Sequence, residues 1–180
     1  MKRFVLFMIT LLFLLGISNI ALAEDLAANE KKFHEEMKAL VPKDKVIDIE
    51  KFKKIHGEIL AGKRKAYIID LRTHPEFYAF HIEGSDHIHA GHFYTIPGKI
   101  KNPDAEIYLL CRTQHRSLYV GGFLYKFGYK NVYVVNGGVV GWVKAGNPVV
   151  NQFVGKFVVT DYHKEFDEKG KYRIREFHPY

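Results

Sequence analysis

The sequence predicts an α/β domain: a parallel sheet covered by helices on both faces, with an N-terminal helix and a C-terminal β-hairpin extension. Two observations lead to this fold class. Short apolar runs typical of strands alternate along the chain with segments of helical periodicity. The runs at residues 66–70 and 106–111 are apolar almost throughout, as strands buried on both faces of a parallel sheet are.

The first 23 residues have the pattern of a secretory signal peptide. Lys2 and Arg3 precede an apolar stretch at residues 4–17, and residues 21–23 form a small-x-small cleavage site. We therefore expect an exported protein, periplasmic or secreted, without stable membrane insertion after cleavage. An uncleaved anchor at residues 4–23 stays open as the alternative.

The rest of the chain has the size of one domain. We divide it into an N-terminal helical segment (24–45), the α/β domain (46–150) and the hairpin extension (151–180). The formal charge of the whole chain is +7, and loss of Lys2 and Arg3 leaves +5. The lysines are dispersed and no arginine-rich block occurs, so we expect no nucleic-acid partner.

The elements follow from periodicity and from breaking residues. Predicted strands cover residues 46–49, 66–70, 85–89, 106–111 and 132–135. Predicted helices cover residues 27–40, 50–60 and 117–127, and a short helix begins at Pro75. Pro97 and Pro103 indicate a loop, and the hairpin strands are predicted at residues 156–166 and 171–177.

Cys111 is the only cysteine of the chain, and it stands between a predicted strand and a predicted helix. A free cysteine is most often an inert, buried apolar residue. Here, however, the turn from strand to helix presents backbone N–H groups and the positive end of a helix, and Arg112 and Arg116 add charge. Such surroundings stabilise a thiolate, so we interpret Cys111 as a nucleophile.

The segment Cys111-Arg112-Thr113-Gln114-His115-Arg116-Ser117 resembles the active-site loop of rhodanese-like sulfurtransferases, commonly Cys-x-x-Gly-x-Arg-Ser/Thr. Further segments resemble motifs of that family in the same order: Ile68-Ile69-Asp70-Leu71-Arg72, His81-Ile82-Glu83-Gly84-Ser85, and residues 128–135, 137–142 and 146–149. The likeness covers residues 46–150, and several motifs in the right order are more specific than one. Three positions depart from it: Gln114 and Phe80 replace a usual glycine, and Glu83 replaces a usual proline.

The resemblance implies a rhodanese-like fold and a sulfurtransferase that uses Cys111 as the catalytic residue. The Cys111 thiolate would take a sulfane sulfur from thiosulfate or a related small donor, and the resulting persulfide would pass it to a thiol or to cyanide. A protein acceptor stays open, and no cofactor is expected. The implied anion-binding loop comprises Arg112, Thr113, Gln114, His115, Arg116 and Ser117. Asp70 and Arg72 are expected to support it, with Asp70 bound to loop backbone or paired with Arg72.

Three alternatives compete with this interpretation. A non-catalytic sulfur carrier or persulfide-binding module would use the same thiol. A cysteine phosphatase would need Cys-x5-Arg, but Arg116 comes one residue too early and Ser117 occupies that place. His87, His89 and His92 could suggest a metal, yet they match no strong ligand spacing, so we expect no metal site.

Overall fold

The structure, a computed structural model, describes residues 26–160. The predicted signal peptide and the second predicted hairpin strand lie outside the described residues. Within residues 26–160, no helix combines the length and the apolar character needed to cross a membrane.

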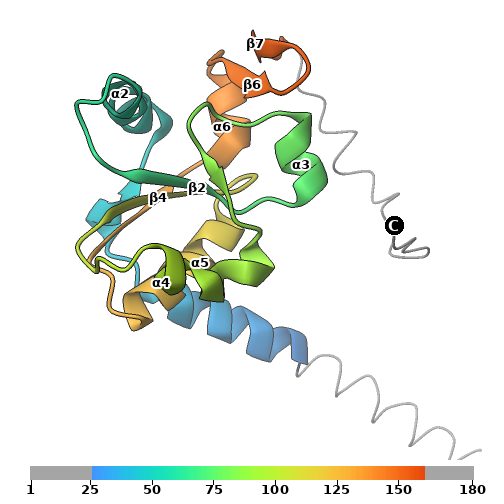
Figure 1. The fold of residues 1–180 in the computed structure, drawn as a ribbon. Coiled ribbons are helices and arrows are strands. Elements are labelled where there is room, and N and C mark those ends of the chain that lie inside the picture. Colours follow the sequence, from blue (N-terminus) through green and yellow to red (C-terminus); the bar gives the residue numbers. More distant parts are fainter. Residues whose placement is uncertain (1–25, 161–180) are drawn as a thin grey trace, which may run out of the picture.

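A five-stranded parallel sheet forms the centre of the domain, in the order β1-β5-β4-β2-β3 (Figure 1). The strands are β1 (Val46–Ile47), β2 (Tyr67–Asp70), β3 (Asp86–His87), β4 (Glu106–Leu110) and β5 (Asn131–Val135). The parallel pairing confirms the predicted fold class. The strand order makes β4 the middle strand, with β2 and β5 as its neighbours.

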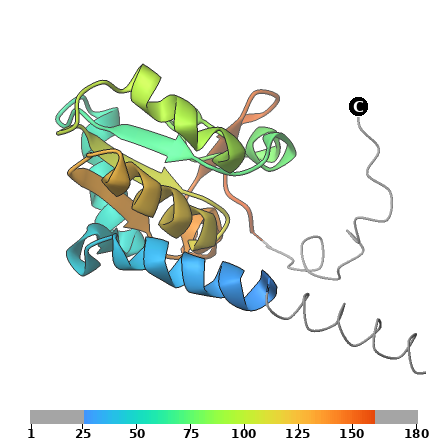
Figure 2. The ribbon, with the colours of Figure 1, turned by 90° about the horizontal axis from the view of Figure 1, so that it is seen from below.

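Helices cover both faces of the sheet, as predicted. Their bounds are residues 26–39, η1 (Lys43–Lys45), α2 (Ile49–Leu60), α3 (His74–Ala79), η2 (Ala90–Thr95), α4 (Ile96–Lys99), α5 (His115–Lys126) and α6 (Gly138–Lys144). In Figure 1, α2 and α6 lie on one side of the sheet, and α4 and α5 lie on the other. Figure 2 shows the helix at residues 26–39 beside α5.

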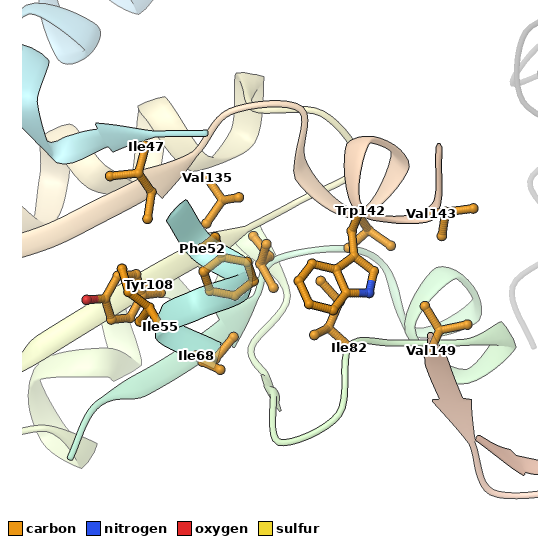
Figure 3. Packing of buried hydrophobic residues seen from close by; sticks show 12 residues of the cluster. Ile47, Phe52, Ile55, Ile68, Ile82, Tyr108, Val135, Trp142, Val143 and Val149 are labelled. Atoms are coloured by element: carbon orange, nitrogen blue, oxygen red, sulfur yellow. The ribbon is translucent and has the colours of Figure 1, made fainter. Parts of the chain in front are cut away.

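Side chains that alternate along the strands build a separate core on each face. Ile68 and Tyr108 join Phe52 of α2 and Trp142 of α6 in one buried cluster (Figure 3). The adjacent residues Ile69, Ile107 and Leu109 belong to the opposite cluster, which also contains Val120 and Leu124 of α5. This division follows from the two-residue period of a strand, because successive side chains point to opposite faces.

The helix at residues 26–39 packs directly onto α5. Met37 is 1% exposed, and a Cβ atom at Gly122 would lie within 3.0 Å of the Met37 backbone. The ring of Phe33 lies 6.0 Å from that of Phe123, centroid to centroid. A glycine on α5 therefore lets two helices approach more closely than any side chain would permit.

Several element boundaries differ from those predicted. Helix α5 begins at His115, two residues before its predicted start at Ser117. No glycine or proline between Arg112 and Ser117 prevents this earlier start. The assignment of Pro97 to a loop is wrong. Pro97 lies in the first turn of α4, where backbone N–H groups make no hydrogen bond within the helix, so the N–H that proline lacks is not needed. Helix α6 was not predicted, because its glycines and valines are weak helix formers.

A C-terminal antiparallel hairpin follows the α/β core, as the fold class predicted, but its strands are not the predicted ones, most of whose residues lie outside the described range. It pairs β6 (Val149–Asn151) with β7 (Gly155–Phe157) in antiparallel register. Asn151 shapes the turn, since its Oδ1 accepts hydrogen bonds from the N–H groups of Phe153 and Val154 at 3.0 and 2.9 Å.

Candidate active site

Cys111 follows directly after β4, at the carboxyl end of the middle strand. Asp70 ends the neighbouring strand β2 and pairs in register with Leu110. The N–H of Leu71 donates to the carbonyl oxygen of Leu110 at 2.8 Å, which extends the pairing past the strand. The structure therefore places Asp70 and Cys111 at adjacent strand ends, where ligands of parallel sheets bind.

The loop after Cys111 is held by the start of α6. The N–H groups of Val139 and Val140 donate to the carbonyl oxygens of Cys111 and Arg112, each at 3.0 Å. In a trans peptide the carbonyl and the following N–H point in opposite directions. With these carbonyls directed at α6, the N–H groups of Arg112 and Thr113 point away from it. Successive donors of this kind form an anion-binding concavity.

Gly138 makes this arrangement sterically possible. A Cβ atom there would come within 3.0 Å of the carbonyl oxygens of Cys111, Arg112 and Thr113. The backbone of Gly138 also has φ +53°, which side chains disfavour. The close approach of α6 to the loop thus depends on a residue outside the predicted site.

Arg116, in the first turn of α5, is fixed by two hydrogen bonds to Glu76 of α3. Its two terminal nitrogens donate to Oε2 and Oε1 of Glu76 at 2.9 and 3.0 Å. Glu76 also completes a capping box with Thr73 at the start of α3. Burial opposes ionisation of Glu76, but the hydrogen bonds from Arg116 and Thr73 outweigh it and lower the pKa of Glu76 to about 2.

Asp70 and Arg72 form a buried pair, as predicted. The guanidinium donates to both carboxylate oxygens of Asp70, with a shortest distance of 2.7 Å, and the backbone N–H of Arg72 donates at 2.9 Å. A further bond joins Arg72 to the carbonyl oxygen of Phe80 at 2.7 Å. Because every one of these contacts is internal, the pair ties β2 to the segment after α3.

Two residues of the loop itself, Cys111 and Ser117, are almost wholly buried. Cys111 is 1% exposed and belongs to the apolar cluster that contains Leu71, Leu109 and Val120. Ser117 has no exposed surface, and its Oγ has no hydrogen-bond partner among the described residues. A buried hydroxyl without a partner is costly, and a functional site is one explanation for it.

The other loop residues lie nearer the surface. Arg112 and Gln114 are half-buried, whereas Thr113 is exposed. Gln114 has φ −165°, an extended conformation that any residue adopts. Phe80, which also replaces a usual glycine, has φ −170°. Neither replacement therefore strains the backbone.

His115 contacts an element that lies outside the predicted domain. Its ring stacks on that of His34, with 4.1 Å between centroids and 14° between planes. Burial and the neighbouring imidazole lower the pKa of His115. The helix at residues 26–39 thus reaches the candidate active-site loop.

Two of the three histidines at positions 87, 89 and 92 make local hydrogen bonds to the backbone. Nε2–H of His87 donates to the carbonyl oxygen of Arg72 at 2.8 Å. Nδ1 of His89 accepts from the N–H of Gly91 at 3.2 Å. Across residues 26–160, no three histidine, cysteine or acidic side chains are arranged to hold a metal ion.

Sequence reasoning missed three residues that shape the site: Glu76, Gly138 and His34. For Glu76 the signal was present, since Thr73-x-x-Glu76 is a capping-box pattern. Gly138 belongs to the segment 137–142 that resembles a family motif, but this likeness assigned it no role in the site. Nothing in the sequence placed His34 beside His115, because that contact depends on how two helices pack.

Comparisons with known proteins agree with this architecture. The rhodanese-like domain family matches residues 48–145. A protein of unknown function from Rhodopseudomonas palustris, described as a possible tyrosine phosphatase, is 19% identical with a TM-score of 0.54; the match covers 66% of this chain and 92% of that one.

Two structures from the Alr3790 protein of Anabaena sp. are also similar. A crystal structure is 18% identical with a TM-score of 0.52, covering 60% of this chain and 94% of the other. A solution structure of its rhodanese-like domain is 17% identical with a TM-score of 0.52, covering 66% and 89%. These likenesses concern the fold, whereas the family match extends over more than half of the sequence. This chain therefore belongs to the rhodanese-like domain family.

Proposed function

We propose that the protein is a thiosulfate-type sulfurtransferase that works through a persulfide on Cys111. The observation that carries this proposal is the loop after β4, whose carbonyl groups are bound by α6 and whose N–H groups point to the other side. Negative charge on the sulfur of Cys111, or on the persulfide, would be stabilised by those donors and by the N-terminus of α5.

The reaction proceeds in two displacements. The Cys111 thiolate attacks the outer sulfur of thiosulfate, the S–S bond of the donor breaks, and sulfite leaves with the bonding electron pair. The enzyme then carries Cys111–S–S⁻. Cyanide or a thiolate attacks the terminal sulfur, forms thiocyanate or a new persulfide, and regenerates the Cys111 thiolate. No external oxidant is consumed, and the kinetics are ping-pong.

The surrounding residues have distinct roles in this scheme. Arg112 meets the oxyanion end of the donor, and the buried hydroxyl of Ser117 donates to the charged sulfur. Arg116, held by Glu76, positions the first turn of α5. Asp70 and Arg72 act as positioning residues beneath the loop. On the pattern of residues 1–23, the reaction takes place outside the cytoplasm.

A second candidate function is a non-catalytic sulfur carrier. The specific observation in its favour is the burial of Cys111, which is only 1% exposed. A persulfide so enclosed would load slowly and turn over little. Phosphatase activity, suggested for the R. palustris protein, is less compatible with this loop, because Arg116 stands one residue short of the spacing that wraps a phosphate.

The Cys111→Ser variant tests the proposal. Thiosulfate should add the mass of one sulfur atom to the wild-type protein but not to the variant, and thiocyanate formation should fall at least about a thousandfold in the variant. Loading of the wild-type protein without steady-state turnover would identify a carrier. Turnover that survives in Cys111→Ser would refute the persulfide mechanism.

A further inference from the structure

An apolar pocket lies between η2 and the outer side of α5. Its volume is 310 Å³. The residues that line it are Ala90, Gly91, Phe93, Arg116, Tyr119, Val120 and Phe123. Except at Arg116 and at the hydroxyl of Tyr119, these side chains offer only hydrocarbon and aromatic surface.

The aromatic wall of this pocket is fixed by ring contacts. Phe93 stacks on Phe123 with 4.7 Å between centroids and 27° between planes. Phe93 also stacks on Phe127, with 6.0 Å between centroids and 14° between planes. Rings held in this way form a preformed surface, so a ligand does not have to order them on binding.

The pocket adjoins the candidate active site through Arg116, which belongs both to the loop and to the pocket lining. Val120, Ala90 and Phe93 also pack in the cluster that contains Cys111. The guanidinium of Arg116 is already bound to Glu76 by two hydrogen bonds, so its charge is compensated within the protein. A group in the pocket therefore meets a mostly apolar environment next to the charge-compensated Arg116 of the candidate active-site loop.

We propose that this pocket binds the apolar group of an organic sulfur substrate, either a thiosulfonate donor or a thiol acceptor with a phenyl-sized substituent. The inference rests on the proposed sulfur transfer at Cys111. A cavity of about 150 Å³ already holds benzene, so the space is ample for one ring. Inorganic thiosulfate and cyanide have no apolar group and leave this surface unused.

A thiosulfonate transfers its outer sulfur to Cys111 by the same displacement as thiosulfate. The Cys111 thiolate attacks the terminal sulfur of R–SO2–S⁻, the bond between that sulfur and the sulfonyl sulfur breaks, and the sulfinate R–SO2⁻ leaves with the electron pair. The acceptor step is unchanged. Only the group R distinguishes the two donors, so the pocket acts on specificity and not on the bond-breaking step.

The test compares donors and acceptors in the wild type and three variants. With cyanide fixed, kcat/KM for benzenethiosulfonate should exceed that for methanethiosulfonate by about tenfold or more. With thiosulfate as the fixed donor, kcat/KM for the aromatic acceptor phenylmethanethiol is compared with that for the acceptor 2-mercaptoethanol. An aromatic preference among the donors identifies the pocket as a donor site, and a preference among the acceptors identifies it as an acceptor site.

Phe123→Ala removes part of the wall, and Ala90→Leu fills the space. Both should raise the KM of the preferred aromatic substrate about tenfold and change that of thiosulfate less than about twofold. Phe153→Ala is the matched control, since this ring is 79% exposed and neither lines the pocket nor contacts its aromatic wall. Thermal melts establish that each variant is folded.

Equal effects on aromatic and inorganic substrates, or no aromatic preference in the wild type, would overturn the proposal. If no donor loads Cys111, the proposed function fails by itself. The pocket is then judged by NMR titration with benzenesulfinate, the leaving group. Shifts that Ala90→Leu abolishes keep the pocket assignment, and the absence of binding rejects it.

Discussion

At the scale of single residues, the candidate site depends on a glycine that is not part of its loop. Gly138 lies against three successive carbonyl oxygens, those of Cys111, Arg112 and Thr113. Those carbonyls fix the direction of the N–H groups on the opposite side of the loop. A side chain at this position would therefore disturb the donors by displacing the loop backbone.

We predict that Gly138→Ala lowers thiosulfate sulfurtransferase activity about a hundredfold and destabilises the fold by about 1–3 kcal/mol, because the loop must move away from the new methyl group. Gly141→Ala on the same helix is the control. Its Cβ would lie 3.1 Å from the side chain of Ile49, which can adjust, and 3.9 Å from the carbonyl oxygen of Asn136, which is an ordinary contact. Steady-state kinetics measure the loss of activity, and thermal melts measure the loss of stability. Comparable losses of activity in both variants would contradict the role of Gly138.

Single residues also show what could be predicted from the sequence and what could not. The pairing of Asp70 with Arg72 was predicted, because a buried carboxylate needs a nearby partner and the arginine stands two residues away. Gln114 stands where the family usually has glycine, and its φ of −165° lies outside the left-handed region that favours glycine. Backbone angles in a loop depend on its tertiary contacts, which one sequence does not display.

At the scale of elements, the helix at residues 26–39 is an integral part of the domain although the family match begins only at residue 48. Its Met37 backbone lies against Gly122 of α5, and its His34 stacks on His115. Tyr119 of α5 also donates a hydrogen bond to Oε1 of Glu30 at 2.6 Å. These contacts hold the first turn of α5, which carries Arg116 and Ser117.

We predict opposite effects for two glycine substitutions in helices. Gly122→Ala should destabilise the fold by about 1–3 kcal/mol, because its methyl group would collide with the Met37 backbone. Gly57→Ala on α2 should stabilise it by about 0.5–1 kcal/mol, because no atom lies within 4 Å of the added methyl group. Chemical denaturation measures both. Stabilisation by Gly122→Ala would show that the two helices are not in close contact.

The elements predicted from sequence were those with a strong apolar pattern. The five strands and α2 were recognised, because buried strands and amphipathic helices repeat their apolar residues regularly. Helix α6 was missed: it has seven residues, begins with a glycine and contains three valines, so neither length nor propensity indicates a helix. It forms because Trp142 and Val143 bury against the sheet.

At the scale of the whole molecule, the ion pair between Glu76 and Arg116 links stability to pH. The pKa of Glu76 is lowered from 4.5 to about 2 in the folded protein. A lowered pKa means that the pair contributes its full stability above the pKa of the unfolded chain. That contribution is lost as the pH falls from 4.5 towards 2.

We therefore predict that the free energy of unfolding decreases between pH 4.5 and pH 2, and that Glu76→Gln reduces this decrease by on the order of 1–3 kcal/mol. At neutral pH the same variant should be less stable than the wild type, since Arg116 loses its partner. Urea denaturation at a series of pH values measures both effects. Glu50→Gln, at an exposed position, controls for the change in net charge, and parallel pH curves for wild type and Glu76→Gln would contradict the prediction.

The overall arrangement was more predictable than the assembly of the site. Alternating strands and helices are sufficient to expect a parallel sheet with a ligand site at the carboxyl ends of its strands. The partners of Cys111 in that site come from α3, α6 and the helix at residues 26–39, which are distant in sequence. Their convergence depends on packing, and no local pattern encodes it.

The position of β4 in the middle of the sheet has a consequence for hydrogen exchange. Edge strands such as β1 and β3 have two residues each and can separate from the sheet in local fluctuations. The central strand loses its amide protection only when the sheet opens on both sides. We therefore expect the amides of β4 to exchange more slowly than those of β1 and β3, so that the Cys111 loop stays anchored during local opening of the edge strands.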